Sequence, residues 1–148
     1  MVSWRSFLRS VSAGCAATFV ALSLTACFDP ASTVSDKDVM VIKPGELKAL
    51  LDKSPDKVVV VDVRSPQAYA QEHITGAINI PLVQLDEGDD RLDKADTIVV
   101  YGSDYTDAQS LAAAKKLLRV GYPNVQDLRM GLSTWKSEQG EGAVESSQ

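Results

Sequence analysis

The sequence predicts an α/β fold in which helices flank a mainly parallel, five-stranded sheet. Two apolar runs rich in β-branched residues, 58–63 and 97–101, are almost free of polar side chains. Strands of this kind are buried on both faces, as in a parallel sheet. Shorter apolar runs alternate with segments whose apolar residues recur at helical spacing, and this alternation favours βαβ units.

The first half of the predicted domain contains three strands and two helices. The first helix is expected where leucines recur at helical spacing after Pro44, a residue suited to a first helical turn. The third strand is short and ends at Pro81. The expected elements are strands 39–42, 58–63 and 77–80 and helices 44–53 and 65–71.

The second half contains two strands and two helices. The longer helix is expected to end at Gly121, which suits a C-terminal cap. Trp135 in the last helix is expected to lie in the core. The stripe of the longer helix expected to face the sheet comprises Ala108, Leu111, Ala112, Lys115 and Leu118. The expected elements are strands 97–101 and 125–128 and helices 107–120 and 132–138.

Composition indicates one globular domain and argues against a nucleic-acid partner. The chain has 148 residues, of which 45% are hydrophobic and 24% charged, and its net charge is -5. Nucleic-acid binding needs a basic patch, and no such cluster of Lys and Arg is present. Ligands of parallel sheets bind beyond the carboxyl ends of the strands. The turns after Val63 and Tyr101 are therefore the first candidates for a site.

The N-terminal residues have the features of an export signal. Arg5 and Arg9 precede residues 11–26, which carry no charge, as in the basic and apolar regions of a signal peptide. This apolar run is shorter than the about 20 residues that a transmembrane helix needs. We therefore expect a signal peptide, with an uncleaved anchor as the alternative.

The segment Leu24-Thr25-Ala26-Cys27 resembles the bacterial lipobox. The resemblance implies that Cys27 carries lipid and that residues 1–26 are removed, whereas Cys15 lacks the preceding leucine. The lipid would hold the protein on a membrane, on the exported side of the bacterial cell envelope, periplasmic or extracellular. Inner and outer membrane both stay open. An ordinary signal peptide with a chance cysteine is the alternative.

The rest of the chain divides into a tether, a domain and a tail. Residues 27–38 are small and polar after the lipidated cysteine and include Pro30, so a flexible tether is expected. Residues 39–139 carry the predicted strands and helices and are long enough for one modest core. Residues 140–148 are expected to be a disordered tail.

Three segments of the predicted domain resemble signatures of the rhodanese-like domain family. Residues 58–81 have the sequence VVVVDVRSPQAYAQEHITGAINIP, residues 97–102 TIVVYG and residues 121–135 GYPNVQDLRMGLSTW. The chain is therefore identified as a member of that family. The resemblance implies a single rhodanese-like α/β domain and, in active members, sulfur transfer.

The resemblance also implies that the activity is lost. Active members place a cysteine directly after the Val-Val-Tyr strand, because a thiolate is nucleophilic enough to carry the sulfur. The matching residue here is Gly102, so no catalytic residue is expected. Asp104 and Asp107 are expected to serve the following helix as caps or first-turn charges. The residues that stay candidates for binding are Asp62, Arg64, Gly102, Ser103, Asp104, Tyr105, Thr106 and Asp107.

A third departure concerns the turn after the first long strand. Many members have a glutamate four residues after the arginine of Asp-Val-Arg, and Ala68 occupies that position here. We therefore expect Arg64 to pair with Glu72 or Asp62. Tyr105 is the aromatic residue expected to face a ligand or partner.

Other chemistries find little support. His73 is the only histidine, which argues against a zinc site, and the family pattern places it in a structural turn. Ser103 lacks the Gly-x-Ser-x-Gly elbow of hydrolases. The acidic run 86–90 lacks the EF-hand pattern and is expected to be a solvated face. No metal and no cofactor are expected.

These observations favour an exported, membrane-anchored lipoprotein whose rhodanese-like domain is catalytically inactive. It would act as a binding module for a protein partner in the cell envelope. The alternative is a thiosulfate or sulfane-sulfur transferase that uses a thiol supplied from elsewhere, either an unmodified Cys27 or a partner's thiol. A receptor for a small ligand in the vacated loop is a third hypothesis.

Overall fold

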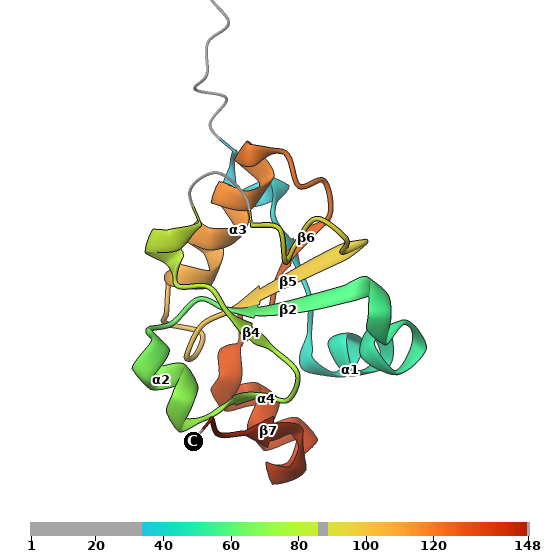
Figure 1. Cartoon of the computed structure of the whole chain (residues 1–148), viewed down its shortest axis with the longest axis vertical. Helices are drawn as coiled ribbons and strands as arrows, with labels where there is room; N and C mark the ends of the chain where they lie inside the picture. Colours follow the sequence, from blue (N-terminus) through green and yellow to red (C-terminus); the bar gives the residue numbers. More distant parts are fainter. Residues whose placement is uncertain (1–33, 86–88, 148) are drawn as a thin grey trace, which may run out of the picture. The chain divides into compact units, whose positions relative to one another are not determined.

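Five parallel strands form the centre of the domain, in the spatial order β1-β6-β5-β2-β4 (Figure 1). The computed structural model describes residues 34–85 and 89–147. The predicted α/β fold with a five-stranded parallel sheet is confirmed. The strands are β1 (Met40–Val41), β2 (Val58–Asp62), β4 (Ile78–Asn79), β5 (Thr97–Tyr101) and β6 (Val125–Asp127).

Several predicted features lie outside the described residues. These are the signal peptide 1–26, the lipidated Cys27, the first part of the tether and residues 86–88 of the acidic run. Residues 31–148 form one compact unit that contains the whole sheet. Within its described part, no helix combines the length and the apolar character that crossing a bilayer requires.

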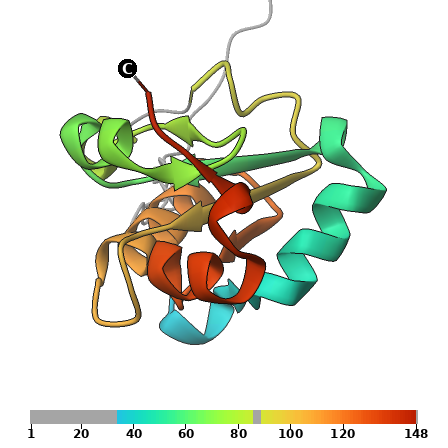
Figure 2. The same ribbon diagram turned by 90° about the horizontal axis from the view of Figure 1, so that it is seen from below.

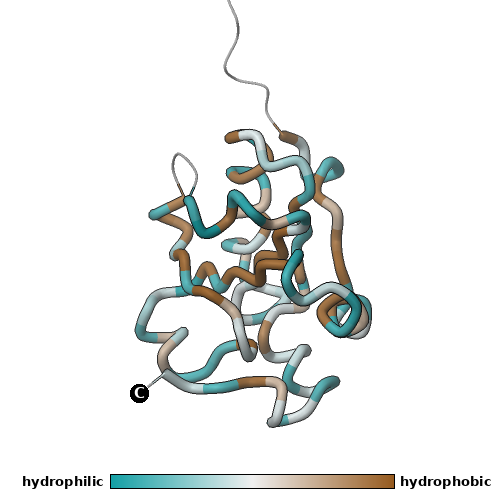
Figure 3. Tube along the Cα trace, turned by 45° about the vertical axis from the view of Figure 1, so that its right-hand side comes forward, coloured by the Kyte–Doolittle hydropathy of each residue, from teal (hydrophilic) through white to brown (hydrophobic). Residues whose placement is uncertain are grey.

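The two central strands show why the β-branched runs form a buried sheet. β2 and β5 pair along their full length, from Val58 beside Thr97 to Asp62 beside Tyr101. All residues of β5 are buried. β-Branched side chains pack well on a pleated surface covered on both sides. The hydrophobic segments accordingly run through the middle of the domain (Figure 3).

Helices cover both faces of this sheet. Figure 1 shows α3 (Gln109–Val120) above the strands and α1 (Pro44–Lys53) and α4 (Gly131–Gln139) below them. A shorter helix, α2 (Pro66–Gln71), follows β2, and Ser65 caps it by accepting a hydrogen bond from the Ala68 N–H. The short 3-10 helices are η1 (Asp36–Asp38), η2 (Pro55–Lys57), η3 (Leu82–Gln84) and η4 (Glu141–Ala143).

Alternation along the strands divides the core into two clusters. Val61 and Val100 pack with the α3 side chains in one cluster. Val60 and Val99 pack with side chains of α1 and α4 in the other, which includes Trp135 as predicted. Successive strand residues point to opposite faces, so adjacent valines fill both cores.

The predicted stripe of α3 is wrong in its position. The helix begins at Gln109, and the side chains that it buries are Ser110, Ala113, Ala114 and Leu117. Leu111 and Leu118 of the predicted stripe pack only at the edge of the core, partly buried. The small residues allow the helix to approach the sheet closely, a preference that hydrophobic spacing alone does not reveal.

The tether is not flexible over its whole length. Residues 36–38 form η1, which begins with a capping box: the Ser35 side chain accepts from the Lys37 N–H, and the Asp38 carboxylate accepts from the Ser35 N–H. Asp36 forms an ion pair of 2.6 Å with Lys115 on α3. Polar residues that suggested flexibility here satisfy a helix end instead.

The predicted disordered tail is also wrong for most of its length. After η4, the strand β7 (Val144–Glu145) pairs antiparallel with β3 (His73–Ile74). Figure 2 shows this dark red segment running alongside the green segment that contains β3. The Trp135 indole N–H donates to the Ala143 carbonyl (3.0 Å), and this buried donor fixes the tail to α4.

Candidate functional site

The loop 102–107 follows β5 at the carboxyl edge of the sheet and leads to α3 (Figure 2). Gly102 is buried, whereas Ser103, Tyr105 and Thr106 are exposed. Parallel sheets bind ligands at this edge. The loop is therefore the first place at which to look for a site.

The Asp107 carboxylate links the start of this loop to the start of α3. Its Oδ2 accepts a hydrogen bond from the Ser103 N–H (2.9 Å), and its Oδ1 accepts one from the Gln109 N–H (2.9 Å). A Cβ atom placed on Gly102 would lie 2.5 Å from Oδ2 of Asp107. The carboxylate thus occupies the space that a side chain at 102 would need, while it caps α3 as predicted.

Asp104 stabilises the tip of the loop. Its Oδ1 accepts hydrogen bonds from both the backbone N–H (2.8 Å) and the hydroxyl (2.6 Å) of Thr106. These bonds lower the pKa of Asp104, because they favour its charged form. Asp104 therefore acts within the turn. It serves the turn rather than the helix end that the sequence suggested.

The first turn of α4 holds the other side of the loop, a role that the sequence analysis missed. The Leu132 N–H donates to the Gly102 carbonyl (3.0 Å), and the Ser133 N–H to the Ser103 carbonyl (3.1 Å). Gly131 has a φ of +68°, and a Cβ there would lie 2.6 Å from the Asp104 nitrogen. Only glycine fits this conformation and this contact. Gly131, which precedes the helix predicted from residue 132, was the sequence signal that could have revealed this role.

Asp62 and Arg64 are not accessible to a ligand. Asp62 is fully buried and Arg64 nearly so. The Arg64 Nη2 donates to Asp62 Oδ2 and to the Glu72 carbonyl oxygen, each at 2.6 Å. The predicted pairing with Asp62 is confirmed, whereas Glu72 contributes its backbone rather than its carboxylate. The expectation that these two residues form a binding surface is wrong, because they are a buried pair that holds the turn after β2.

Tyr101 supports the same turn from β5. Its hydroxyl accepts a hydrogen bond from the Ile74 N–H (3.1 Å), and its ring lies under the Arg64 guanidinium at 5.9 Å. Burial, with the nearby Asp62 charge, raises the pKa of Tyr101 well above its usual range. This tyrosine is therefore a neutral structural group.

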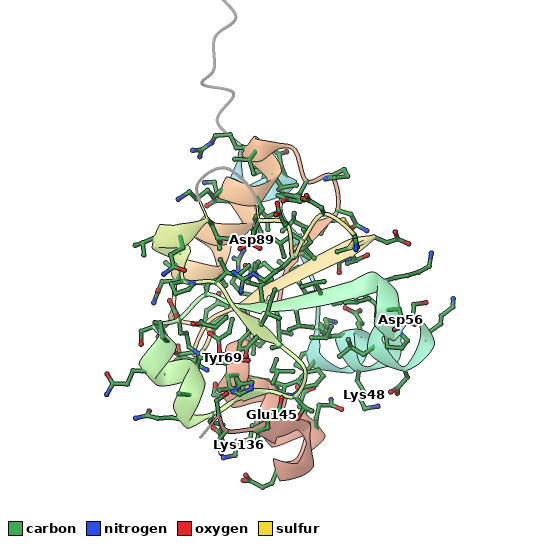
Figure 4. The ribbon with its side chains drawn as sticks, viewed as in Figure 1. Lys48, Asp56, Tyr69, Asp89, Lys136 and Glu145 are labelled. Atoms are coloured by element: carbon green, nitrogen blue, oxygen red, sulfur yellow. The ribbon has the colours of Figure 1, made fainter. Side chains whose placement is uncertain are left out.

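His73 is structural, as predicted. Its ring is buried and stacks on Tyr69 at 3.7 Å, and its Nδ1 lies 2.8 Å from the Tyr69 carbonyl oxygen. Figure 4 shows Tyr69 and Lys136 in the same region of the domain as Glu145, which belongs to β7. The Glu145 carboxylate accepts a hydrogen bond from the Gly76 N–H (2.9 Å). Across residues 34–85 and 89–147, no group of three potential ligands could hold a metal ion.

Two grooves flank the loop. The larger, of about 690 Å³, is mostly apolar and lies beside Tyr105, Val41 and Met130. The smaller, of about 300 Å³, lies between the turn after β2 and the start of α3, beside Val63 and Gln109. Tyr105 is 66% exposed, so its side chain is accessible, and its contact with a ligand or partner stays a prediction.

Arg129 lines the larger groove and is held from behind by a buried acid. Its Nε donates to Oδ2 of Asp127 (2.6 Å), a residue with no exposed surface. The other oxygen of Asp127 has no hydrogen-bond partner among the described residues. Sequence reasoning missed this pair, since a short strand that ends in the polar residues Gln126 and Asp127 gives no sign that its aspartate is buried.

Comparison with known proteins agrees with this architecture. A family model for the rhodanese-like domain matches residues 43–138. The chain is 32% identical to thiosulfate sulfurtransferase GlpE of Coxiella burnetii over 54% of this chain and 73% of the relative. It is 42% identical to thiosulfate sulfurtransferase PspE of Escherichia coli, over 45% and 64% respectively.

Solved structures give the same result. The BH2092 protein of Bacillus halodurans superposes with a TM-score of 0.66 at 32% identity, covering 74% of this chain and 79% of that one. The rhodanese-like domain of the Alr3790 protein from Anabaena has a TM-score of 0.59 at 29% identity, with 72% and 78% covered. The motifs, the sheet order and these matches agree, and the chain belongs to the rhodanese-like domain family.

Proposed function

We propose that this protein is an exported lipoprotein whose rhodanese-like domain binds a partner and does not transfer sulfur. The Asp107 carboxylate carries the proposal. It accepts hydrogen bonds from the backbone N–H groups of Ser103 and Gln109, and it fills the space beside Gly102. Gly102 stands, on this proposal, where active members of the family carry their cysteine.

Sulfur transfer needs a thiolate, and the matched domain has none. Cys15 and Cys27 are the two cysteines of the sequence, and both precede residues 43–138. No other side chain holds a transferable sulfur as a persulfide. The Asp107 carboxylate also repels an anionic donor such as thiosulfate. The loop is therefore poorly suited to sulfur chemistry in two independent ways.

The exposed loop tip, with the larger groove beside it, is the surface that we assign to a protein partner in the cell envelope. Ser103, Tyr105 and Thr106 are its accessible residues. A tyrosine at an exposed site offers a large contact area at a low entropic cost. The lipobox-like segment ending at Cys27 supports attachment of lipid, which would keep the domain at a membrane surface.

The alternative is a sulfurtransferase, the activity named for GlpE and PspE. The likeness to these relatives favours it. It requires a thiol from outside the domain, either an unmodified Cys27 or one on a partner. With Cys27 as the thiol, the alternative predicts sulfur transfer by the purified full chain, whereas the binding proposal predicts none. With a partner's thiol, sulfur transfer would require that partner to be added.

The test is production of thiocyanate from thiosulfate and cyanide by the full chain, purified in detergent, and by its Cys27→Ala variant. Neither is expected to exceed the rate without protein. Activity in the full chain that the Cys27→Ala variant lacks would establish the alternative with Cys27 as the thiol. Activity in both would refute the binding proposal outright.

The lipid anchor is tested separately. Bacteria that express the full chain are labelled with palmitate, with the Cys27→Ala variant as control and Cys15→Ala as a matched control. Label is expected on the wild type and the Cys15→Ala variant only. Equal label on the Cys27→Ala variant would remove the lipoprotein part of the proposal and leave the inactive domain untouched.

A further inference from the structure

His73 lies where the C-terminal strand joins the rest of the domain. β7 pairs antiparallel with β3, and this register places Glu145 opposite His73. The two nitrogens of the buried His73 ring lie near oxygen atoms from different parts of the chain. Nδ1 is 2.8 Å from the Tyr69 carbonyl oxygen of α2, and Nε2 is 3.4 Å from Oε1 of Glu145. Of these two contacts, only the second depends on the C-terminal strand.

The two contacts suit a protonated imidazole ring better than a neutral one. The Tyr69 carbonyl oxygen can only accept a hydrogen bond, so Nδ1 is the nitrogen that carries the proton of the neutral ring. The unprotonated Nε2 then faces the Glu145 carboxylate, which also only accepts. A second proton, on Nε2, turns this unfavourable contact into an ion pair.

The Glu145 carboxylate is held in place by contacts that do not involve His73. Its Oε1 accepts a hydrogen bond from the Gly76 N–H (2.9 Å). Two residues before it, the Ala143 carbonyl oxygen accepts one from the Thr75 N–H (3.1 Å). These bonds fix the strand beside the histidine whatever the charge of the ring. Protonation of His73 therefore needs no rearrangement to strengthen the contact.

The other charged side chains near β3 are paired with one another. Lys136 on α4 forms ion pairs with Glu72 (2.6 Å) and Glu141 (3.1 Å). The hydrogen bonds of these carboxylates raise the pKa of Lys136, because they favour its charged form. The buried Asp62 pairs with Arg64, which also donates to the Glu72 carbonyl oxygen. Neither pair offers a free charge to His73.

Two tyrosines complete the surroundings of His73, and both are neutral. The Tyr69 hydroxyl donates to the Ala77 carbonyl oxygen (2.6 Å), and the Tyr101 hydroxyl accepts from the N–H of the next residue in β3. Burial raises the pKa of both tyrosines. Within the described ranges, the carboxylate in ion-pair contact with His73 is therefore that of Glu145.

We propose that Glu145 is the counter-ion of a protonated His73, and that this pair attaches the C-terminal strand more firmly in acid than in base. The pair favours the protonated ring in the attached strand. Its contribution is accordingly present below the pH at which His73 loses its proton and is lost above it. Histidines lose their proton between about pH 5 and pH 8, where glutamates are ionised. The proposal does not depend on the proposed function, since neither lipid, thiol nor partner enters it.

The counter-ion is tested by proton NMR of residues 31–148, the compact unit that contains the whole sheet, without a histidine tag. His73 is the only histidine of the chain, so its ring signal titrates alone. Glu145→Gln keeps an oxygen for the Gly76 N–H but removes the charge. It should lower the midpoint of the titration by about half a pH unit. Glu141→Gln is the matched control, because Glu141 pairs with Lys136 and should leave the midpoint unchanged.

Hydrogen exchange of the Thr75 amide tests the attachment of the strand. This N–H is bonded to the Ala143 carbonyl oxygen, so it is protected while the C-terminal segment is attached. Relative to the unprotected rate at each pH, protection should be up to about threefold greater at about pH 6 than at about pH 8. The difference should persist in Glu141→Gln and disappear in Glu145→Gln.

Fluorescence of Trp135, the only tryptophan in residues 31–148, shows whether each variant keeps its C-terminal segment in place. The same His73 titration in the wild type and in Glu145→Gln would overturn the assignment of the counter-ion. A lowered midpoint without a change in Thr75 protection would overturn the effect on the strand. Neither result bears on sulfur transfer or on lipid attachment, so the proposed function stands or falls separately.

Discussion

The space beside Gly102 can be tested by adding one carbon atom. In a Gly102→Ala variant, the new Cβ would lie 2.5 Å from Oδ2 and 2.9 Å from Cγ of Asp107. Gly102 does not have a positive φ, so the backbone tolerates alanine. The carboxylate must therefore move, and its hydrogen bonds with the Ser103 and Gln109 N–H groups are lost or weakened.

The magnitude follows from these two bonds. Hydrogen bonds to a charged group contribute about 1.5–3 kcal/mol each, and the half-buried site favours the lower end. Alanine also restricts the unfolded chain, which stabilises the fold by about 0.4–1 kcal/mol. We expect Gly102→Ala to lower the free energy of unfolding by about 2–3 kcal/mol where both bonds are lost, and by about 1 kcal/mol where one of them survives.

A double-mutant cycle isolates the clash. In an Asp107→Ala background the carboxylate is absent, and Gly102→Ala should become neutral or stabilise the fold by up to about 1 kcal/mol. Urea unfolding of residues 31–148 gives the free energies, provided that the slope with urea is unchanged. Gly45→Ala is the control, because nothing lies within 4 Å of a Cβ there and it lies in α1. It should stabilise the fold by about 0.5–1 kcal/mol. An equal loss from Gly102→Ala in both backgrounds would refute the assignment of this space to Asp107.

Three further predictions concern other parts of the domain. Gly131→Ala should destabilise by more than about 2 kcal/mol in urea unfolding, because it combines a positive φ with a backbone contact. Unlike Gly102→Ala, it should not be rescued by Asp107→Ala. Removal of residues 141–148 should lower the urea midpoint and increase exposure of Trp135, seen as a red shift of its fluorescence, because the indole loses the Ala143 carbonyl; an unchanged spectrum would contradict the docked tail. The Arg91 hydrogen bonds lower the pKa of Asp89 (Figure 4) to about 2. The stability that this carboxylate contributes is present above pH about 4 and lost toward pH 2, so the difference between wild type and Asp89→Asn in thermal melts should narrow over that range.

The sequence predicted the sheet well because its signals were local. β-Branched runs at 58–63 and 97–101 contain few polar residues, and burial on both faces follows directly from that. The prediction of a disordered tail at residues 140–148 was wrong for the opposite reason, because the structure there depends on a distant part of the chain. Whether Val144 forms a strand depends on its partner Ile74 across the fold, and a two-residue strand carries almost no pattern of its own. The predicted buried face of α3 was wrong because alanine is equally suited to the core and to the surface of a helix.

The candidate site was predictable in position but not in accessibility. The motif placed Asp62 and Arg64 correctly at the end of a strand, and their charges suggested a surface for ligands. Burial reverses that interpretation, because a fully buried carboxylate requires a paired cation and its hydrogen bonds. Arg64 is that cation. A sequence shows that two opposite charges are near each other, but not whether solvent reaches them.

Gly102 and Asp107 are best understood as a coupled pair. A side chain at 102 would overlap the present position of the Asp107 carboxylate, so one of the two must shift. Introducing cysteine at 102 alone would place a thiol against a carboxylate, which raises the thiol pKa and reduces the reactive thiolate. On the proposed function, sulfur chemistry in this loop would therefore need two changes, one that supplies a thiol and one that removes the carboxylate. For that reason the Asp107 carboxylate is a stronger argument for the proposed binding role than the absence of a thiol at 102. A partner can supply a thiol, whereas an anionic donor entering this loop would meet the carboxylate whichever thiol is used.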